Sequence, residues 1–212
     1  MKHITFYLDF ISPYAYLAFE RLPETLEGLS YSVSYKPLLL GALFMHHGHV
    51  APADVPSKRA WVYRQALWLG RANGIPIDMP ASHPYNPLPH LRLALATTGT
   101  GEISRYVAET IFHDVWRGGG NAADPARLAA LAARLTLVRE SSGEEVKVQL
   151  RANTEEAAAA GVFGVPAYSV GEQVVWGFDA LPMLRAMVED DPWFDSAAWR
   201  SAADRPGIVR AK

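Results

Sequence analysis

The chain combines 212 residues, half of them hydrophobic, with a net charge of −2 at pH 7. A chain of this size buries a full core as one large domain or two small ones, and its mixed charge gives no support to the binding of nucleic acid or another polyanion. No stretch approaches the roughly 20 apolar residues of a membrane span, and the N-terminus shows no signal-peptide pattern. We therefore expect a cytoplasmic protein without a nucleic-acid or membrane partner.

The absence of cysteine limits the chemistry further. It excludes disulfide bonds, thiolate metal sites and a redox cycle on the protein's own sulfur, so any sulfur chemistry needs a thiol from a bound ligand. A metal would have to be held by histidine and carboxylate side chains. The local histidine cluster of His46, His47 and His49 has a spacing that fits no standard helical pair. We interpret it as a loop that is flexible or faces a substrate, and we expect no metal site.

The N-terminal residues predict a strand–helix–strand unit. Apolar residues recur over 3–9, a helical pattern follows over 13–28, and a short β-rich stretch covers 30–36. Ser12 is a typical N-cap, and Pro13 has the preset φ that is favoured at the first helical position. A unit of this length favours parallel pairing of its two strands with a right-handed crossover.

A helical block follows this unit. Residues 37–56 predict an irregular passage, and 75–90, which contain five prolines, predict a second one. Apolar spacing predicts helices between and after these passages, at 57–73, around 88–95, 103–111 and 128–138, and at 143–160. Asp124 as N-cap and Pro125 at the first helical position indicate the start of the helix that contains 128–138.

Strand character returns near the C-terminus. Two short runs, 167–170 and 173–176, are joined by Gly171-Glu172, which predicts a hairpin. Residues 180–189 predict a last helix, and we expect the aromatic residues of the tail beyond it to pack on the body of the protein.

The order of these elements, βαβ, helical block and ββα, predicts an α/β fold in which an all-helical insertion splits one sheet domain. We place the sheet domain at 1–40 and 161–212, and the insertion at 41–160.

Two stretches far apart in the sequence have features of a ligand site. A helix N-terminus such as that at Ser12 and Pro13 offers free N–H groups and partial positive charge to an anion or a thiolate, although ordinary capping is the commoner explanation of a Ser-Pro pair. Pro166 is either a trans residue at a strand edge, as most X-Pro bonds are, or a cis residue. In the cis form the N–H and C=O of Val165 would turn outward and could pair with an extended peptide.

These stretches resemble a known family. Residues 9–14 read DFISPY, residues 161–166 read GVFGVP and residues 176–179 read WGFD. In this order they are similar to the 2-hydroxychromene-2-carboxylate isomerases and their relatives, the kappa-class glutathione transferases, which have a thioredoxin-like fold of the disulfide-oxidase type. The disulfide oxidases carry C-x-x-C where this chain has Ser12-Pro13-Tyr14-Ala15. Four further motifs extend the resemblance over nearly the whole chain: KPLLLG (36–41), VPSKR (55–59), HPYNPL (83–88) and WRGGGNAADP (116–125).

The resemblance implies a glutathione site. Ser12 would donate its hydroxyl to the glutathione sulfur, with Pro13 and Tyr14 beside it, and Val165 and Pro166 would hold the cysteinyl backbone. The γ-glutamyl end would meet Trp176, Gly177, Phe178 and Asp179. Asp179 would be the carboxylate for the γ-glutamyl amino group. From the residues alone Asp179 is also an N-cap for the last helix, and both roles can hold together.

The resemblance places the second substrate beside Met45, His49, Val50 and Tyr85. Relatives commonly carry Lys and Asn where this chain has Met45 and His49, so the substrate half of the site departs from the family pattern. Phe44 and either Trp68 or Trp116 could add apolar walls, although aromatic residues at helical spacing are more often ordinary core.

The resemblance implies a homodimeric, glutathione-dependent isomerase acting on 2-hydroxychromene-2-carboxylate or a similar aromatic-derived unsaturated carboxylate. Two alternatives stay open: a kappa-class-like glutathione transferase that releases a conjugate, and a non-catalytic glutathione-binding module that kept the fold and lost the chemistry.

Overall fold

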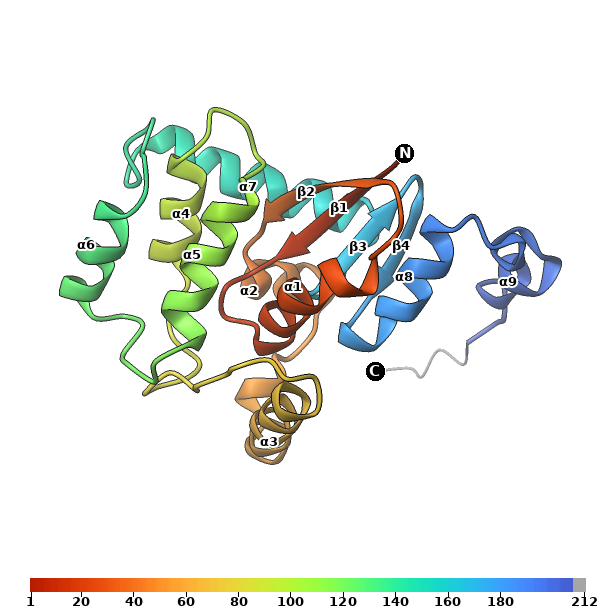
Figure 1. Ribbon diagram of the computed structural model, residues 1–212, viewed down its shortest axis with the longest axis horizontal. Coiled ribbons are helices and arrows are strands. Elements are labelled where there is room, and N and C mark those ends of the chain that lie inside the picture. Colours follow the sequence, from red (N-terminus) through yellow and green to blue (C-terminus); the bar gives the residue numbers. More distant parts are fainter. Residues whose placement is uncertain (208–212) are drawn as a thin grey trace.

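A four-stranded sheet in the order β2-β1-β3-β4 forms the centre of this computed structural model, which describes residues 1–207 (Figure 1). Its strands are β1 (Lys2–Leu8), β2 (Tyr31–Pro37), β3 (Ala167–Val170) and β4 (Gln173–Trp176). β1 pairs in parallel with β2, and β3 pairs antiparallel with both β1 and β4. The predicted parallel unit and the predicted hairpin are thus confirmed, and they share one sheet. Residues 208–212, which we assigned to the sheet domain, lie outside the described residues.

Helices from the N-terminal, central and C-terminal parts of the chain surround this sheet. α1 (Pro13–Thr25) contacts α8 (Leu181–Val188), and α7 (Glu144–Ala159) contacts β2. α8 also contacts β3, and Figure 1 shows it beside β4. The fold is therefore the α/β arrangement expected from the order of the elements, and it is the thioredoxin-like fold that the resemblance implied.

The segment between β2 and β3 is helical. Its helices are α2 (Leu40–His47), α3 (Pro56–Ala72), α4 (Leu88–Ala96), α5 (Arg105–Trp116), α6 (Pro125–Ala133) and α7, with a short 3-10 turn at Pro52–Asp54. α4, α5 and α6 contact one another beside the β2 edge, whereas α3 stands apart from them (Figure 1). Asp124 caps α6 by accepting the N–H of Arg127 at 2.9 Å, as its place before Pro125 predicted.

One passage that we predicted to be irregular contains a helix. α2 lies within 37–56, and its own N-cap residue makes no side-chain capping bond. Instead, Oδ2 of the distant Asp9 accepts the N–H of Leu40 at 2.9 Å. A local reading of the sequence could not find this start because the capping group comes from the end of β1.

Two helices are shorter than predicted. α1 ends at Thr25, before Gly28, and α6 ends at Ala133, so that Leu135 and Val138 follow the helix instead of belonging to it. Leu135 is nevertheless buried. The apolar spacing of the sequence indicated which residues are buried, and burial continues past the last residue of the helix.

The core is rich in aromatic rings that join the sheet to the helices. Phe6 of β1 stacks on Tyr168 of β3 with ring centroids 5.1 Å apart. Phe112 of α5 contacts Phe10 at 4.9 Å and Phe19 of α1 at 5.2 Å, and all five rings are fully buried. α5 is consequently packed directly against the segment that leads from β1 into α1.

The C-terminal tail forms a 3-10 turn (Pro192–Asp195) and the short helix α9 (Ala197–Ala202), seen at the far right of Figure 1. Phe194 and Trp199 pack against the core as expected, whereas Trp193 is 51% exposed. In the part of the chain that the structure describes, no helix is long and apolar enough to cross a membrane.

The buried side chain of Asn153 connects α7 to the end of β2 by a hydrogen bond. Nδ2 of Asn153 donates to the carbonyl oxygens of Pro37 at 2.8 Å and Gly101 at 2.7 Å, and its Oδ1 accepts from Gln149 at 3.0 Å. Asn153 is fully buried. The end of β2 is thereby bonded to the last helix before β3.

We expect Asn153→Ala to lower the free energy of unfolding by about 2–4 kcal/mol, because it leaves one buried and one partly buried carbonyl group without a donor, and a buried group without a partner costs about 1–3 kcal/mol. Gln149→Ala, which removes only the partner of Oδ1, is the matched control and should cost less. Chemical denaturation of the three proteins measures both values. Equal losses in the two variants would contradict the fastening role of Asn153.

Candidate functional site

Ser12 begins α1 and faces the second predicted stretch. Its Oγ accepts the N–H of Ala15 at 3.2 Å, which is ordinary N-capping. The same hydroxyl donates to the carbonyl oxygen of Val165 at 3.4 Å, and the residue is only 4% exposed. Ser12 Oγ therefore both caps α1 and contacts a segment 153 residues away in the sequence.

The second stretch is joined to the end of β4. The Val165–Pro166 peptide bond is cis, one of the two alternatives that the sequence left open. Gly177 donates its N–H to the carbonyl oxygen of Pro166 at 2.9 Å. The indole Nε1 of Trp176 lies so close to Gly164 that a Cβ there would come within 2.7 Å of it. The structure thus brings the GVFGVP and WGFD stretches together, with Trp176 half exposed at their edge.

Gly177 turns the chain toward Asp179. Its φ of 108° suits only glycine, and a Cβ would come within 2.4 Å of Asp179 Oδ1. Asp179 is exposed, and Phe178 is partly buried against the core. The expectation that Asp179 caps the last helix is wrong: a 3-10 turn (Phe178–Ala180) intervenes, and Ala180 is the N-cap of α8 without a side-chain bond.

Unused backbone donors lie beside the Ser12–Val165 contact. Within residues 1–207, neither the N–H of Tyr14 nor that of Val165 has a hydrogen-bond partner. The Tyr14 group belongs to the first turn of α1, where N–H groups lack intrahelical acceptors and the helix dipole is positive. Pro13 is buried and contributes no N–H. The arrangement suits an anionic sulfur together with an extended peptide backbone.

The buried carboxylate of Asp9 holds the turn that presents Ser12. Its Oδ1 accepts the N–H of Ile11 at 3.2 Å, its Oδ2 that of Leu40 at 2.9 Å, and its carbonyl that of Ser12 at 3.1 Å. Complete burial raises the pKa of this carboxyl to about 7, against the opposing effect of the backbone N–H groups of Leu40, Ile11 and Phe10. Asp9 therefore connects the Ser12 turn to the start of α2.

Two rings from the helical segment hold the carbonyl groups of the same turn. Trp116 Nε1 of α5 donates to the oxygen of Phe10 at 2.9 Å, and His83 Nε2 lies 2.8 Å from the oxygen of Ile11. Because a carbonyl oxygen can only accept, His83 Nε2 carries a proton. The backbone before Ser12 is thus fixed from several directions.

The predicted substrate residues divide between the surface and the interior. Met45 is 77% exposed, Val50 is 68% exposed, and His49 is exposed at the end of α2. Tyr85 is buried, and its hydroxyl has no hydrogen-bond partner in the described chain. Burial raises the pKa of that hydroxyl well above its ordinary value, with a smaller contribution from Asp9. Tyr85 does not share the surface of the other three residues.

The aromatic side chains considered as pocket walls also differ from one another. Trp116 is fully buried, which agrees with the core alternative. Trp68 is 63% exposed on α3, so it belongs to neither the core nor an enclosed pocket. Phe44 is partly buried on α2, with its ring 6.4 Å from that of His49.

The histidine cluster lies at the end of α2. His46 and His47 belong to its last turn, and not to a loop as we expected. His47 Nε2 lies 2.9 Å from the carbonyl oxygen of Val162 and so links α2 to the GVFGVP stretch. Within residues 1–207, no three histidine or acidic side chains are grouped so that they could hold a metal ion.

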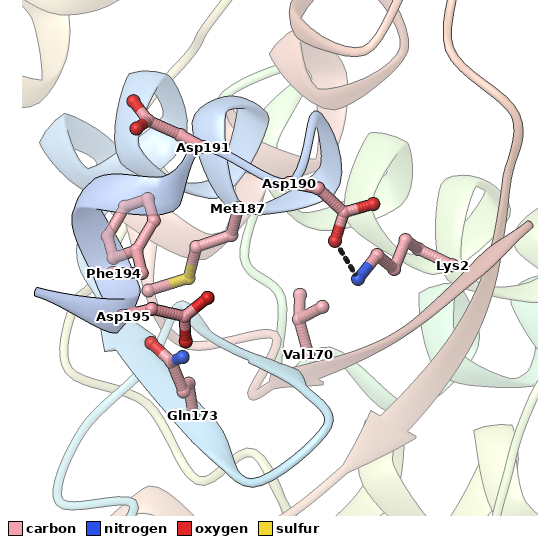
Figure 2. A pocket seen from close by; sticks show the side chains of 8 residues that line it. All are labelled: Lys2, Val170, Gln173, Met187, Asp190, Asp191, Phe194 and Asp195. Carbon is pink, nitrogen blue, oxygen red and sulfur yellow. Dashed lines mark ion pairs between the residues drawn. The ribbon is translucent and has the colours of Figure 1, made fainter.

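The cavity in Figure 2 is separate from this site. It measures about 300 Å³ and is lined by residues of the sheet edge and the C-terminal tail: Lys2, Val170, Gln173, Met187, Asp190, Asp191, Phe194 and Asp195. A second hollow of about 370 Å³ is lined by 137–141. Neither includes a residue of the DFISPY or GVFGVP stretches.

The sequence indicated no role for Asp9 and His83 at this site, and it indicated Trp116 only as an apolar wall or as core. Each lies within a quoted motif, and Asp9 carried a local signal, since it is an acidic residue directly between an apolar strand and a helix start. No spacing in the sequence connects His83 or Trp116 with the Ser12 turn, because their partners are 72 and 106 residues away.

We expect Asp9→Asn to change how stability depends on pH. The folded carboxyl has a pKa of about 7, against an ordinary value of 3.8, so the native state binds more protons between these values. The free energy of unfolding should therefore fall as pH rises through this window, by up to about 1.4 kcal/mol per unit, and become level above it. Asp9→Asn should remove this part of the slope. Denaturation at a series of pH values measures it, and identical slopes in the two proteins would contradict the raised pKa.

Comparison with known proteins identifies the family of this chain. Residues 3–189 match the family model described as "DSBA-like thioredoxin domain". The chain is 30% identical over 197 residues to a 2-hydroxychromene-2-carboxylate isomerase of Pseudomonas sp. (strain C18), with 89% of this chain and 91% of that protein covered. It is 26% identical over 202 residues to glutathione S-transferase kappa 2 of Caenorhabditis elegans, with 86% and 90% covered.

A solved structure of 2-hydroxychromene-2-carboxylate isomerase aligns with a TM-score of 0.75 at 22% identity, covering 95% of this chain and 98% of that one, which shows a shared fold. The chain therefore belongs to the DSBA-like thioredoxin-domain family, among the 2-hydroxychromene-2-carboxylate isomerases and their kappa-class glutathione transferase relatives.

Proposed function

We propose that this protein is a glutathione-dependent isomerase that acts on 2-hydroxychromene-2-carboxylate or a similar aromatic-derived unsaturated carboxylate. The named relatives support the reaction class. The observation that carries the proposal is the contact of Ser12 Oγ with Val165, at a helix N-terminus with unused N–H groups within the described chain. In a protein without cysteine, such a place suits a thiol supplied by a ligand.

The proposed role of Ser12 is to stabilise a thiolate. A thiol with a pKa of about 8.5 is only a few per cent ionised near neutrality, and lowering this pKa by ~1–2 units requires roughly 1.4–2.7 kcal/mol. A helix N-terminus contributes ~0.3–1 kcal/mol, and a hydroxyl hydrogen bond to a charged acceptor contributes ~1.5–3 kcal/mol. These two contributions suffice together. The Ser12 hydroxyl proton, now directed at the Val165 oxygen, would turn to the sulfur.

Ser12 is not proposed as a nucleophile. Its hydroxyl contacts Ala15 and Val165, and within residues 1–207 no histidine or carboxylate side chain is hydrogen-bonded to it. Activation of a serine requires an adjacent base. Glutathione, when bound, would supply the nucleophilic thiolate that adds reversibly to an activated carbon of the substrate and leaves unchanged.

The other residues of the site would orient the tripeptide. The Val165 N–H, which has no partner in the described chain, would pair with the cysteinyl backbone next to Pro166. Trp176 and Gly177 lie beside that segment and lead to the exposed Asp179, whose carboxylate would accept the γ-glutamyl amino group. Asp179 is available for this role because it does not cap α8.

We also propose that the substrate approaches from the exposed end of α2, past Met45, His49 and Val50, while Tyr85 supports the site from the interior. The His47–Val162 contact supports this placement because it holds α2 against the GVFGVP stretch. The division into a sheet domain (1–40 and 161–212) and a helical insertion (41–160) belongs to the same proposal. It is supported by the sheet, which draws its strands only from the two flanking segments of the described chain.

Product analysis tests the function. With substrate and a limiting amount of glutathione, the isomerase should convert many equivalents of substrate while free glutathione stays constant, and conversion should stop without glutathione. A stoichiometric loss of glutathione into a conjugate would identify a transferase instead. Calorimetry that detects no binding at millimolar glutathione would identify a module without this chemistry.

We expect Ser12→Ala to raise the pKa of bound glutathione by about 1–2 units, which corresponds to the loss of one hydrogen bond to a charged sulfur. Thiolate absorbance during a pH titration measures this shift. Ser104→Ala is the matched control, since Ser104 caps α5 with the same 3.2 Å bond to an N–H group. Both variants should lose about 1 kcal/mol of stability through the missing cap. If Ser12→Ala titrates like the wild type, the proposed role of Ser12 is wrong.

A further inference from the structure

The ring of His83 lies between the Ser12 turn and α3. Its Nε2 donates to the carbonyl oxygen of Ile11 at 2.8 Å, and its Nδ1 is 3.0 Å from the hydroxyl oxygen of Tyr63 on α3. The Tyr63 hydroxyl also donates to the backbone oxygen of His83 at 2.5 Å. Both ring nitrogens and the backbone of His83 are therefore engaged, and the orientation of the ring is fixed.

The protonation state of the ring fits this double contact. Burial lowers the pKa of His83 below its ordinary value, so the ring is neutral near pH 7. With the proton on Nε2, Nδ1 can only accept, so the single Tyr63 hydroxyl proton is shared between Nδ1 and the backbone oxygen of His83. Nε2 therefore donates toward Ile11, while Nδ1 and the backbone oxygen accept on the side of Tyr63.

A second ring supports the position of His83. The ring of Trp116 lies 5.7 Å from that of His83, and its Nε1 donates to the carbonyl oxygen of Phe10. The carbonyl groups of Phe10 and Ile11 precede Ser12 directly in the sequence. Two neighbouring rings thus hold two successive carbonyl groups of the turn.

α3 is a largely exposed helix that contacts α1 and the 3-10 turn at Pro52–Asp54. Only Ala66 and Gly70 of this helix are buried, and Figure 1 shows it apart from α4, α5 and α6. Besides the Tyr63–His83 contact, Gln65 accepts a hydrogen bond from the Tyr14 hydroxyl at 2.6 Å. Both contacts connect α3 with residues beside Ser12.

We propose that His83 is a positioning residue that fixes the Ser12 hydroxyl relative to α3 through the backbone of Ile11. This inference rests on the proposed function for its effect on catalysis, although the geometry it describes exists without a ligand. A misplacement of about 1 Å at a reacting group can cost on the order of 100-fold in rate. His83 influences the thiolate site without touching it.

Three variants separate the two halves of the contact. His83→Phe keeps a planar ring and removes both nitrogen contacts. His83→Gln offers an amide N–H to the Ile11 oxygen, and Tyr63→Phe removes only the hydroxyl on α3. His3→Phe is the matched control, because His3 is an exposed histidine on β1 that contacts Ser32.

In the ligand-free proteins, hydrogen exchange of the segment 9–16 tests positioning directly. We expect His83→Phe to accelerate exchange there by about tenfold, with little change in α7, whereas His3→Phe should match the wild type. Acceleration that is equal in all segments, or absent, would overturn the inference. This measurement stands even if the wild type fails to bind glutathione, a result that would remove the proposed function alone.

In the loaded enzyme, we expect His83→Phe to lower kcat by about 10–100-fold and to raise the pKa of bound glutathione, with the KM for the carboxylate within about twofold of wild type. His83→Gln should recover part of the loss, and Tyr63→Phe should give a smaller loss of the same kind. If His83→Phe does not fold, the last two variants decide in the same assays. Wild-type values of kcat and thiol pKa in either of the folded variants His83→Phe and Tyr63→Phe would overturn the inference.

Discussion

The carboxylate of Asp9 is the contact on which the arrangement of the site depends. It is completely buried, yet it accepts the N–H groups of Ile11 and Leu40, and so joins the turn before α1 to the first residue of α2. An acidic group in such a position is retained at the cost of desolvation, which is why its pKa is raised. In return, the hydrogen bonds of Asp9 hold the turn that leads into Ser12.

The helical segment between β2 and β3 makes further contacts that hold the turn before Ser12. Trp116 and His83 hold the two carbonyl groups before Ser12, and His47 holds the Val162 carbonyl in the facing stretch. The segments that follow β1 and precede β3 supply the two halves of the proposed site, and contacts from the segment between β2 and β3 hold them in place. Under the proposed function, this division of roles would let a thioredoxin-like fold without cysteine present a helix N-terminus to an external thiol. The protein would contribute geometry and hydrogen-bond donors, and the ligand would contribute the sulfur.

Most of the fold could be predicted because its signals are local. Apolar periodicity, the Asp124–Pro125 cap and the Gly171 turn each lie within a few residues of the element they define. α2 escaped prediction because its cap comes from Asp9, which lies in another part of the sequence. In the site, the motifs indicated Ser12 and Val165, and the structure places them in contact. The burial of Tyr85, the replacement of Asp179 as N-cap and the contacts of His83 depend on tertiary packing, which no local pattern encodes.

A crystal structure of the protein soaked with glutathione tests the central claim most directly. We expect the sulfur to lie within hydrogen-bond distance of Ser12 Oγ, close to the Tyr14 N–H, and the cysteinyl backbone to pair with Val165. A tripeptide bound with its sulfur away from Ser12, or a Ser12 hydroxyl that keeps Val165 as its acceptor while glutathione occupies another place, would contradict it.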